Sequence, residues 1–281
     1  MVSIVIASYN AEKTILKTIT SCINQTYEDI EVVVVNDAST DRTQYIVEEL
    51  ACKDNRIKLI NLEVNSGAGA AKKTGIDSIK GEYMCILDSD DFLKSDHIET
   101  LYKRAIAFNA DIVVSGYILT DYQHNIIQIS KPEEKTVYGK EKYIPNNTNW
   151  YLNSTLIKSS LWDSVEYSNR VLLDDIPTLV KLLYFANCVS TVDYAGYYYV
   201  QNPSSIQHSA SLMKEKIFSL LALKDMLLFF ISKGNKLPTR EFCVRYEELL
   251  QLDIEEEEYA LYKEELDELY NYYITLNNPI G

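Results

Sequence analysis

The chain has 281 residues, 47% of them hydrophobic, so it is long enough to bury a substantial core. Its 27 Lys and Arg against 41 Asp and Glu give a formal net charge of −14, which opposes nucleic acid or anionic lipid as an electrostatic partner. The five cysteines are scattered without metal-binding spacing, which indicates reduced thiols. No basic leader precedes the first apolar run, and no apolar stretch reaches about 18 residues. We therefore expect a cytoplasmic protein that associates at most peripherally with the inner face of a membrane.

Short apolar runs alternate with helix-period segments as far as Leu87. The predicted strands are residues 2–7, 31–35, 57–62 and 83–87, and the predicted helices between them are residues 11–24, 41–52 and 68–79. This alternation predicts an α/β fold with a mostly parallel central sheet and helices on both faces. Ligands bind at the carboxyl ends of such strands. There the chain places Ser8-Tyr9-Asn10, Asn36-Asp37, Asn65-Ser66-Gly67 and Asp88-Ser89-Asp90.

After residue 111 the alternation breaks. A strand (IVVSGYIL) with a hairpin around residues 123–125 predicts a mixed sheet, and a helix over 174–185 precedes strands near 188–192 and 197–200. Beyond residue 210 the composition changes to an apolar helix (217–231) and an acidic one (241–274). We therefore predict a domain of residues 1–210, with halves 1–115 and 116–210, followed by a helical C-terminal extension of residues 211–281.

Asp88 and Asp90 form an Asp-x-Asp pair at the exit of a buried strand. In extended chain, side chains two apart point the same way, so the two carboxylates converge and repel each other by roughly 4 kcal/mol at about 4 Å and an effective dielectric near 20. Mg²⁺ or Mn²⁺ would relieve that repulsion and leave positions open for substrate phosphates. Alone, the pair is more typical of loop and helix-cap chemistry than of a metal site.

The stretch from Gly67 to Gly75 fits neither a GxGxxG fingerprint nor a GxxxxGK[ST] loop, because Lys72 replaces a required glycine in both. A Gly-rich helix start carrying a lysine fits better. Its amides and cation could bind the phosphates of a donor, and a flexible helix entrance with a solvated lysine is the alternative.

Asp174 and Asp175 open a predicted helix, with Pro177 in its first turn. Acids at this position complement the helix dipole without any further role, and the functional alternative is a general base. His208 lies in a loop that could fold over a site, where it is a candidate contact to metal or phosphate, and an ordinary surface histidine is the alternative.

Six motifs occur together in one order, and through them the chain resembles the family 2 glycosyltransferases of the GT-A fold. The resemblance covers about residues 1 to 208. The motifs are VSIVIASYN, VVVVNDASTDRT, NSGAGAAKKTGI, GEYMCILDSDDFL, LLDDIPTLVKLLYFA and YYYVQNPSSI. The QxxRW motif and membrane spans of processive members are absent, so the resemblance implies single-sugar transfer of the non-processive bacterial type.

The resemblance implies a role for each matching residue. Tyr9 would flank the uracil base of a UDP-sugar, and Asp37 would hydrogen-bond its edge. Asp90 would bind Mn²⁺ or Mg²⁺, with Asp88 near the ribose or the metal and Asp91 supporting the loop. Lys72 stands where the family commonly has an arginine, and Asp175 matches the catalytic base. The donor-nucleotide residues implied in this way are Ser8, Tyr9, Asp37, Gly67, Lys72, Asp88 and Ser89.

These inferences predict a metal-dependent, inverting glycosyltransferase (hexosyltransferase) that moves one sugar from a UDP-sugar to a hydroxyl. The acceptor is expected to be a saccharide or lipid-linked saccharide in bacterial surface polysaccharide assembly (capsule, exopolysaccharide or O-antigen). The alternatives are an inactive member that binds a nucleotide sugar as a scaffold subunit, and a sugar-nucleotide nucleotidyltransferase. The helices after residue 210 could pack on the core, form a homodimer or lie on a membrane.

Overall fold

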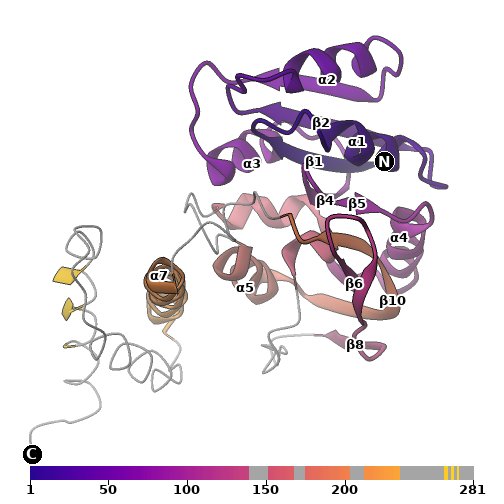
Figure 1. Ribbon diagram of the computed structural model, residues 1–281. Coiled ribbons are helices and arrows are strands. Elements are labelled where there is room, and N and C mark those ends of the chain that lie inside the picture. Colours follow the sequence, from indigo (N-terminus) through magenta and orange to yellow (C-terminus); the bar gives the residue numbers. More distant parts are fainter. Residues whose placement is uncertain are drawn as a thin grey trace, which may run out of the picture. The chain divides into compact units, whose positions relative to one another are not determined.

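The computed structural model describes residues 1–138, 151–167, 175–202 and 212–234, together with 263, 264, 267, 268 and 271. It divides into two compact units, Met1–Ser205 and Ile206–Gly281 (Figure 1). The first unit holds every strand that the structure describes, and the second holds α7 (Leu212–Ser232). None of the described helices has the length and apolar character needed to cross a bilayer. The domain boundary near residue 210 remains a prediction.

The first half of unit Met1–Ser205 is a parallel β/α arrangement, as the sequence predicts. Its strands have the order β3-β2-β1-β4 and all run parallel. They are β1 (Val2–Ser8), β2 (Ile30–Asn36), β3 (Ile57–Asn61) and β4 (Tyr83–Asp88), joined by α1 (Ile15–Ile23), α2 (Thr43–Ala51) and α3 (Ala68–Ile76). The carboxyl ends of these strands therefore share one edge of the sheet.

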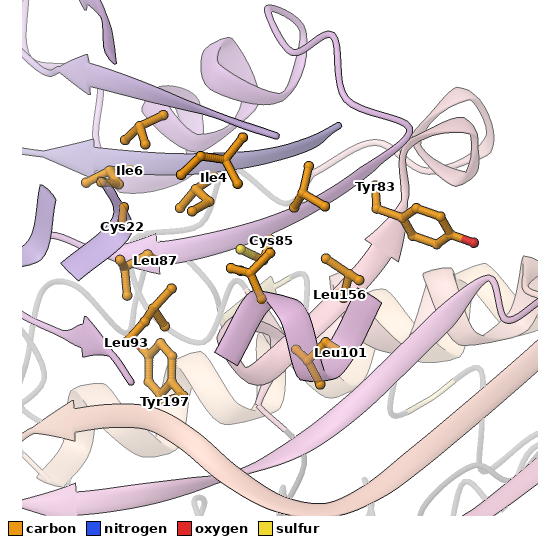
Figure 2. Packing of buried hydrophobic residues seen from close by; sticks show 14 of the residues in the cluster. Ile4, Ile6, Cys22, Tyr83, Cys85, Leu87, Leu93, Leu101, Leu156 and Tyr197 are labelled. Atoms are coloured by element: carbon orange, nitrogen blue, oxygen red, sulfur yellow. The ribbon is translucent and has the colours of Figure 1, made fainter. Parts of the chain in front are cut away.

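The alternation of side chains along the buried strands divides the core between the two faces of the sheet. On one face, Ile4 and Ile6 of β1 pack in a cluster with residues of α1, α2 and α4 (His97–Phe108), part of which is drawn in Figure 2. On the other face, Val5 packs in a cluster with α5 (Asp175–Phe185). On this face α3 lies close to β1. A Cβ added at Gly75 of α3 would lie only 2.4 Å from Val5 Cγ1, so glycine permits this approach.

The second half of the unit continues the sheet in the order β4-β9-β6-β10-β5. Its strands are β5 (Phe92–Leu93), β6 (Ile112–Thr120), β7 (Ile126–Ser130), β8 (Lys135–Tyr138), β9 (Thr155–Lys158) and β10 (Cys188–Val200), with 3-10 turns η1 (Leu152–Ser154) and η2 (Ser159–Ser164) beside β9. Because β9 is antiparallel to both β4 and β6, while β10 is parallel to β6, the strands β4, β6 and β10 point the same way. The expected mixed sheet and the β6–β7 hairpin are confirmed.

One prediction for this half is wrong. The two strands expected near 188–192 and 197–200 are a single strand, β10, whose pairing with β6 is irregular between Thr191 and Tyr197. A β-bulge inserts extra residues without ending a strand, so the polar stretch around Asp193 resembles a turn in the sequence although the strand continues.

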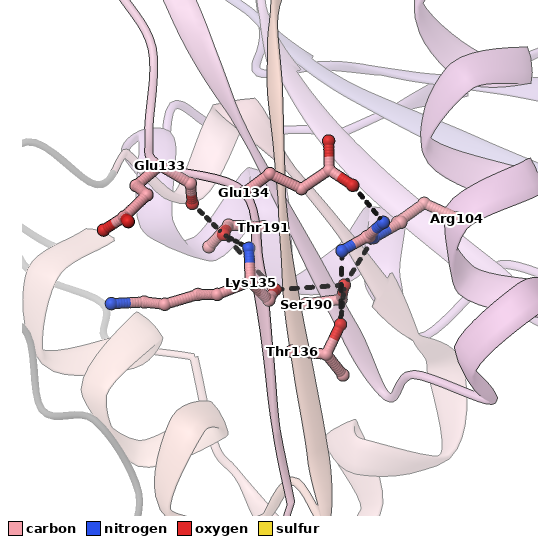
Figure 3. A network of polar contacts seen from close by, with 7 residues as sticks. All are labelled: Arg104, Glu133, Glu134, Lys135, Thr136, Ser190 and Thr191. Atoms are coloured by element: carbon pink, nitrogen blue, oxygen red, sulfur yellow. Dashed lines mark hydrogen bonds and ion pairs between the residues drawn. The ribbon is translucent and has the colours of Figure 1, made fainter.

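A polar network ties β8 to β10 and to α4 (Figure 3). The guanidinium group of Arg104 donates to Ser190 Oγ at 2.7 Å, to Thr136 Oγ1 at 3.2 Å and to Glu134 at 2.6 Å. Thr136 and Ser190 share a further hydrogen bond of 2.8 Å. The network fixes the strand that leads toward residue 139, where the described part of the chain is interrupted.

His97, in the first turn of α4, is a buried and neutral histidine. Its ring is 1% exposed and stacks on Tyr194 at 5.9 Å, and its Nδ1 finds no hydrogen-bond partner among the described residues. Burial lowers the pKa of His97 to about 4, and the nearby charge of Asp96 opposes that shift only in part.

We expect His97 to make the protein less stable in mild acid. Between pH 6.5 and about 4 the unfolded histidine binds a proton that the folded one does not, so stability falls as the pH falls through that window. The loss approaches ~3 kcal/mol, since one pKa unit corresponds to about 1.4 kcal/mol. Urea unfolding followed by tryptophan fluorescence at pH 7 and pH 4.5 should show a smaller loss for His97→Phe than for wild type. Equal losses would contradict the assignment.

Candidate donor site at the carboxyl edge of the sheet

The loops after β1 and β2 hold each other at the edge of the sheet. Asn10 Oδ1 accepts a hydrogen bond from the Thr40 amide at 2.8 Å, and the Asn10 amide donates to Ser39 Oγ at 3.0 Å. Asn10 itself has a left-handed backbone with φ of 48°, which asparagine tolerates better than most residues. The preceding Tyr9 remains 49% exposed at this edge. An aromatic ring is thus presented to solvent beside the strand ends.

Asp37, predicted to contact the donor base, is buried and shapes the loop before α3. Its Oδ1 accepts from the Ser66 amide at 2.7 Å and its Oδ2 accepts from the Gly67 amide at 2.8 Å. Gly67 has a φ of 88°, a conformation that glycine adopts at little cost. A carboxylate has about four lone-pair sites, so these two amides leave Asp37 able to accept further hydrogen bonds.

Asp88, at the end of β4, lies between a cation and an amide. Lys72 Nζ of α3 is 3.2 Å from Asp88 Oδ1, and Asn153 Nδ2 donates to Asp88 Oδ2 at 2.6 Å. The Lys72 side chain is only 7% exposed, so its charge is directed at the Asp-x-Asp segment rather than into bulk water. Asn153 Nδ2 also donates to Tyr197 Oη at 3.2 Å. Asn153 was not predicted from the sequence.

Asp91 anchors the acidic loop to β10. Its carboxylate accepts hydrogen bonds from Tyr197 Oη and from the Val200 amide, the latter at 2.8 Å. Thr18 Oγ1 of α1 donates to the carbonyl oxygens of Ser89 at 2.9 Å and of Asp91 at 2.8 Å. Ser89 thus contributes its backbone to the loop structure. The position of the loop is fixed from two directions, by α1 and by β10.

Asp90 lies between these two anchored acids. Asn202 Nδ2, just beyond β10, donates to Asp90 Oδ2 at 3.2 Å. Burial raises the pKa of the Asp90 carboxyl, the charge of Asp88 raises it further, and Asn202 and Lys72 oppose the rise. Burial, together with the charges of Asp90 and Asp88, holds the pKa of Asp91 well above its ordinary value. The loop therefore brings three acidic side chains together, of which Asp91 is buried and Asp88 and Asp90 are partly exposed.

The donor set of this loop fits a hard divalent cation. Within the ranges that the structure describes, no three His, Cys, Asp or Glu side chains gather to enclose a metal ion. Mg²⁺ and Mn²⁺ sites that serve phosphates need no such cage, because one or two carboxylates suffice when water and substrate phosphates complete the coordination. Asp90, with Asp88 beside it, offers carboxylate oxygens of this kind.

Asp175 is the first residue of α5, and its charge acts on Tyr151. The pKa of Tyr151 is raised to about 12, first by burial and in smaller part by the charges of Tyr117 and Asp175. The Tyr151 ring lies 5.9 Å from that of Tyr199, whose pKa is in turn raised by burial and by the acidic loop. Tyr151 thus feels the charge of the predicted base, and the neighbouring Tyr199 feels the charges of the acidic loop.

The remaining predicted residues divide into two groups. The Ser8 side chain is buried at the end of β1, and its hydroxyl has no hydrogen-bond partner in the part of the chain that the structure describes. His208 and Asp174 lie outside the described residues, so their roles stay predictions.

The fold matches the GT-A fold of solved glycosyltransferases, which confirms the predicted fold class. TarS residues 1–349 of S. aureus, solved with UDP-GlcNAc, superposes with a TM-score of 0.65 at 20% identity over 89% of this chain and 71% of TarS. The mannosyltransferase PcManGT of Pyrobaculum calidifontis, solved with GDP-Man and Mn²⁺, gives a TM-score of 0.60 at 18% identity over 88% of this chain and 69% of that one.

Sequence comparison identifies the family. The model of glycosyl transferase family 2 matches residues 3–160. Glycosyltransferase GlyG of Streptococcus pneumoniae serotype 4 (strain ATCC BAA-334 / TIGR4) is 31% identical over 83% of this chain and 79% of GlyG. The putative glycosyltransferase EpsH of Bacillus subtilis (strain 168) is 31% identical over 84% of this chain and 70% of EpsH. This chain belongs to glycosyl transferase family 2, as predicted.

Proposed function

We propose that this chain is a metal-dependent, inverting glycosyltransferase that moves one sugar from a UDP-sugar to a hydroxyl of a saccharide or lipid-linked saccharide. The observation that carries the proposal is the acidic loop of Asp88, Asp90 and Asp91 at the carboxyl edge of the sheet, held in place by Lys72, Asn153 and Tyr197. Such a loop favours a cation-bound phosphate over a neutral ligand.

Each part of the site has a place in this chemistry. Tyr9 and Asp37 lie at the strand ends where the base of the nucleotide would bind, with Ser8 and Gly67 adjacent. Asp90, assisted by Asp88, would hold the metal, and a bound Mn²⁺ or Mg²⁺ would supply positive charge to the departing diphosphate. Asp175 accepts the proton of the acceptor hydroxyl as its oxygen attacks the face of the sugar opposite to the leaving group, so one displacement inverts the anomeric centre.

Relatives support a role in polysaccharide assembly. The succinoglycan biosynthesis protein ExoO of Rhizobium meliloti (strain 1021) is 40% identical over 41% of this chain and 32% of ExoO. We propose that this protein likewise builds a bacterial surface polysaccharide, on the cytoplasmic side of the membrane. Residues 1–210 would carry the reaction, and the helical extension of residues 211–281 would support a homodimer.

The donor can be tested with the purified full chain. Incubation with UDP-GlcNAc, UDP-glucose, UDP-galactose or GDP-mannose should release nucleoside diphosphate from one UDP-sugar, with Mn²⁺ or Mg²⁺ and not with EDTA. UDP-GlcNAc is the first choice, because TarS was solved with it. Release from GDP-mannose alone would overturn the assignment of uridine, and release that EDTA leaves unchanged would overturn the metal dependence. An anomeric signal of the product that matches the donor would contradict inversion.

A further inference from the structure

Two loops at the carboxyl edge of the sheet hold each other through reciprocal hydrogen bonds. They follow the neighbouring strands β1 and β2, and we call residues 10–12 and 39–43 together the loop clasp. Three amides of the first loop donate to side chains of the second: Asn10 to Ser39 Oγ at 3.0 Å, Ala11 to Thr43 Oγ1 at 2.7 Å and Glu12 to Asp41 Oδ2 at 3.0 Å. Two amides of the second loop donate back: Thr40 to Asn10 Oδ1 at 2.8 Å and Arg42 to Glu12 Oε2 at 3.1 Å. Each loop therefore satisfies backbone groups of the other.

The same two loops hold left-handed backbone at residues that are not glycine. The φ angle is 48° at Asn10 and 55° at Ala38. Asparagine adopts this region readily, whereas alanine does so at a cost, because its Cβ comes close to the backbone carbonyl oxygen. Such a conformation persists only where surrounding contacts hold it, and it is typical of functional sites. Each of these residues directly follows a predicted base contact, Tyr9 or Asp37.

Tyr9 depends on its backbone for its orientation. Its side chain is 49% exposed, and within the residues that the structure describes no hydrogen bond or ring contact holds it. On one side of Tyr9, β1 ends at Ser8, whose carbonyl oxygen accepts from the Asp37 amide at 2.8 Å. On the other side is Asn10, which the loop clasp holds at both its amide and its side chain. The clasp therefore limits the directions in which the Tyr9 ring can point.

We infer that Asn10 and Asp41 are positioning residues for the base of the nucleotide, and that they act through Tyr9. Asn10 fixes the residue directly after the ring. Asp41 accepts from the Glu12 amide and, on its other oxygen, from the Thr43 amide at 2.9 Å, so it joins the first loop to the start of α2. A ring that is already oriented loses less freedom when a base binds, which strengthens binding without a new contact. This inference rests on the proposed function, in which Tyr9 flanks the base.

A double-mutant cycle on the full chain, followed by UDP titration calorimetry with Mn²⁺ present, tests the role of Asn10. Asn10→Gly permits the left-handed backbone but removes the acceptor of the Thr40 amide. It should weaken UDP binding about two- to ten-fold, the cost of ordering one side chain. Tyr9→Ala should weaken it roughly ten-fold, within the range of base–aromatic stacking. In the double variant Asn10→Gly should add no further loss, because the ring through which it acts is gone.

Asp41→Asn and Asp54→Asn form a matched pair for the second positioning residue. Each aspartate accepts from the amide two positions further on, Thr43 at 2.9 Å and Arg56 at 3.0 Å, but Asp54 precedes β3 at the opposite edge of the sheet. Both substitutions should lower the melting temperature. Only Asp41→Asn should weaken UDP binding, and it should do so only while Tyr9 is present.

Hydrogen exchange of the protein without ligand tests the loop clasp itself. Asn10→Gly should speed exchange in both loops, at residues 10–12 and 40–43, and leave the protection of β3 unchanged. Exchange that stays as in wild type at residues 40–43 would contradict the reciprocal hold.

Two results in the binding experiments would overturn the positioning role. One is an additive loss in the double variant of Tyr9 and Asn10, and the other is an equal loss of UDP affinity in Asp41→Asn and Asp54→Asn. A wild-type protein that binds GDP and not UDP would instead overturn the proposed donor alone. The same cycle measured with GDP would then decide whether Asn10 acts through Tyr9.

Discussion

Asp175→Asn is expected to reduce kcat by roughly 10²–10⁴-fold while the affinity for UDP stays unchanged, because a positioned general base contributes about that factor. Asparagine keeps the size of the side chain and its ability to accept hydrogen bonds at the start of α5, but it cannot take a proton from the acceptor hydroxyl. The loss should therefore appear in transfer and not in binding. Steady-state kinetics with saturating donor, together with UDP titration by calorimetry, measures both quantities.

A matched control separates the base from a general loss of negative charge. Asp163→Asn removes an exposed carboxylate from η2. Surface substitutions rarely change stability by more than about 0.5 kcal/mol, so the fold should be intact and kcat should stay within about two-fold of wild type. If Asp175→Asn retains near-normal transfer, the base lies elsewhere. If it loses UDP binding as well, Asp175 acts on the donor rather than on the acceptor.

The parallel half of the fold is predictable because its signals are local. Each strand from β1 to β4 is a short apolar run, and each crossover shows a helical period, so neighbours in sequence determine the elements. The start of α1 shows the limit of such signals. The sequence predicts helix from residue 11, whereas α1 begins at Ile15, and the Ala11 amide before it donates to Thr43 Oγ1 at 2.7 Å in the next helix.

The second half of the fold depends on partners that are distant in sequence. β5 consists of two residues, Phe92 and Leu93, and exists because Tyr197 and Tyr198 pair with it. β9 pairs Lys158 with Tyr83. Neither segment shows a strand period long enough to recognise. Strands of this kind are formed by tertiary contacts that override weak local preference.

The same distinction applies to the candidate site. Asp88 and Asp90 were predicted because they stand at the end of a buried strand, and Asp37 was predicted because it directly follows another. Asn153 and Asn202 were missed, since they contact Asp88 and Asp90 across 65 and 112 positions of sequence and carry no periodic signal of their own. Lone amides are ordinary loop residues in a sequence, and only the folded chain shows which carboxylate each one orients.

Asp90→Asn is expected to abolish the stabilisation of the protein by UDP with Mn²⁺, which for wild type should amount to about 2.7 kcal/mol at a hundred-fold excess of ligand over Kd. Asparagine still accepts the hydrogen bond from Asn202, so the loop should keep its structure, but a neutral amide oxygen binds a hard cation poorly. Thermal unfolding with UDP and Mn²⁺ added separately and together measures the effect.

Asp90→Asn should raise the stability of the protein when neither UDP nor metal is present. Asp90 is one of three neighbouring acids, and the charge of Asp88 raises the pKa of both Asp90 and Asp91. Removing the charge of Asp90 relieves this repulsion and should raise the melting temperature without UDP or metal. Glu28→Gln, an exposed acid before β2, should change neither measurement. A rise without ligand combined with loss of the UDP–Mn²⁺ shift is the signature of a metal-binding carboxylate. Retention of that shift in Asp90→Asn would overturn the metal assignment.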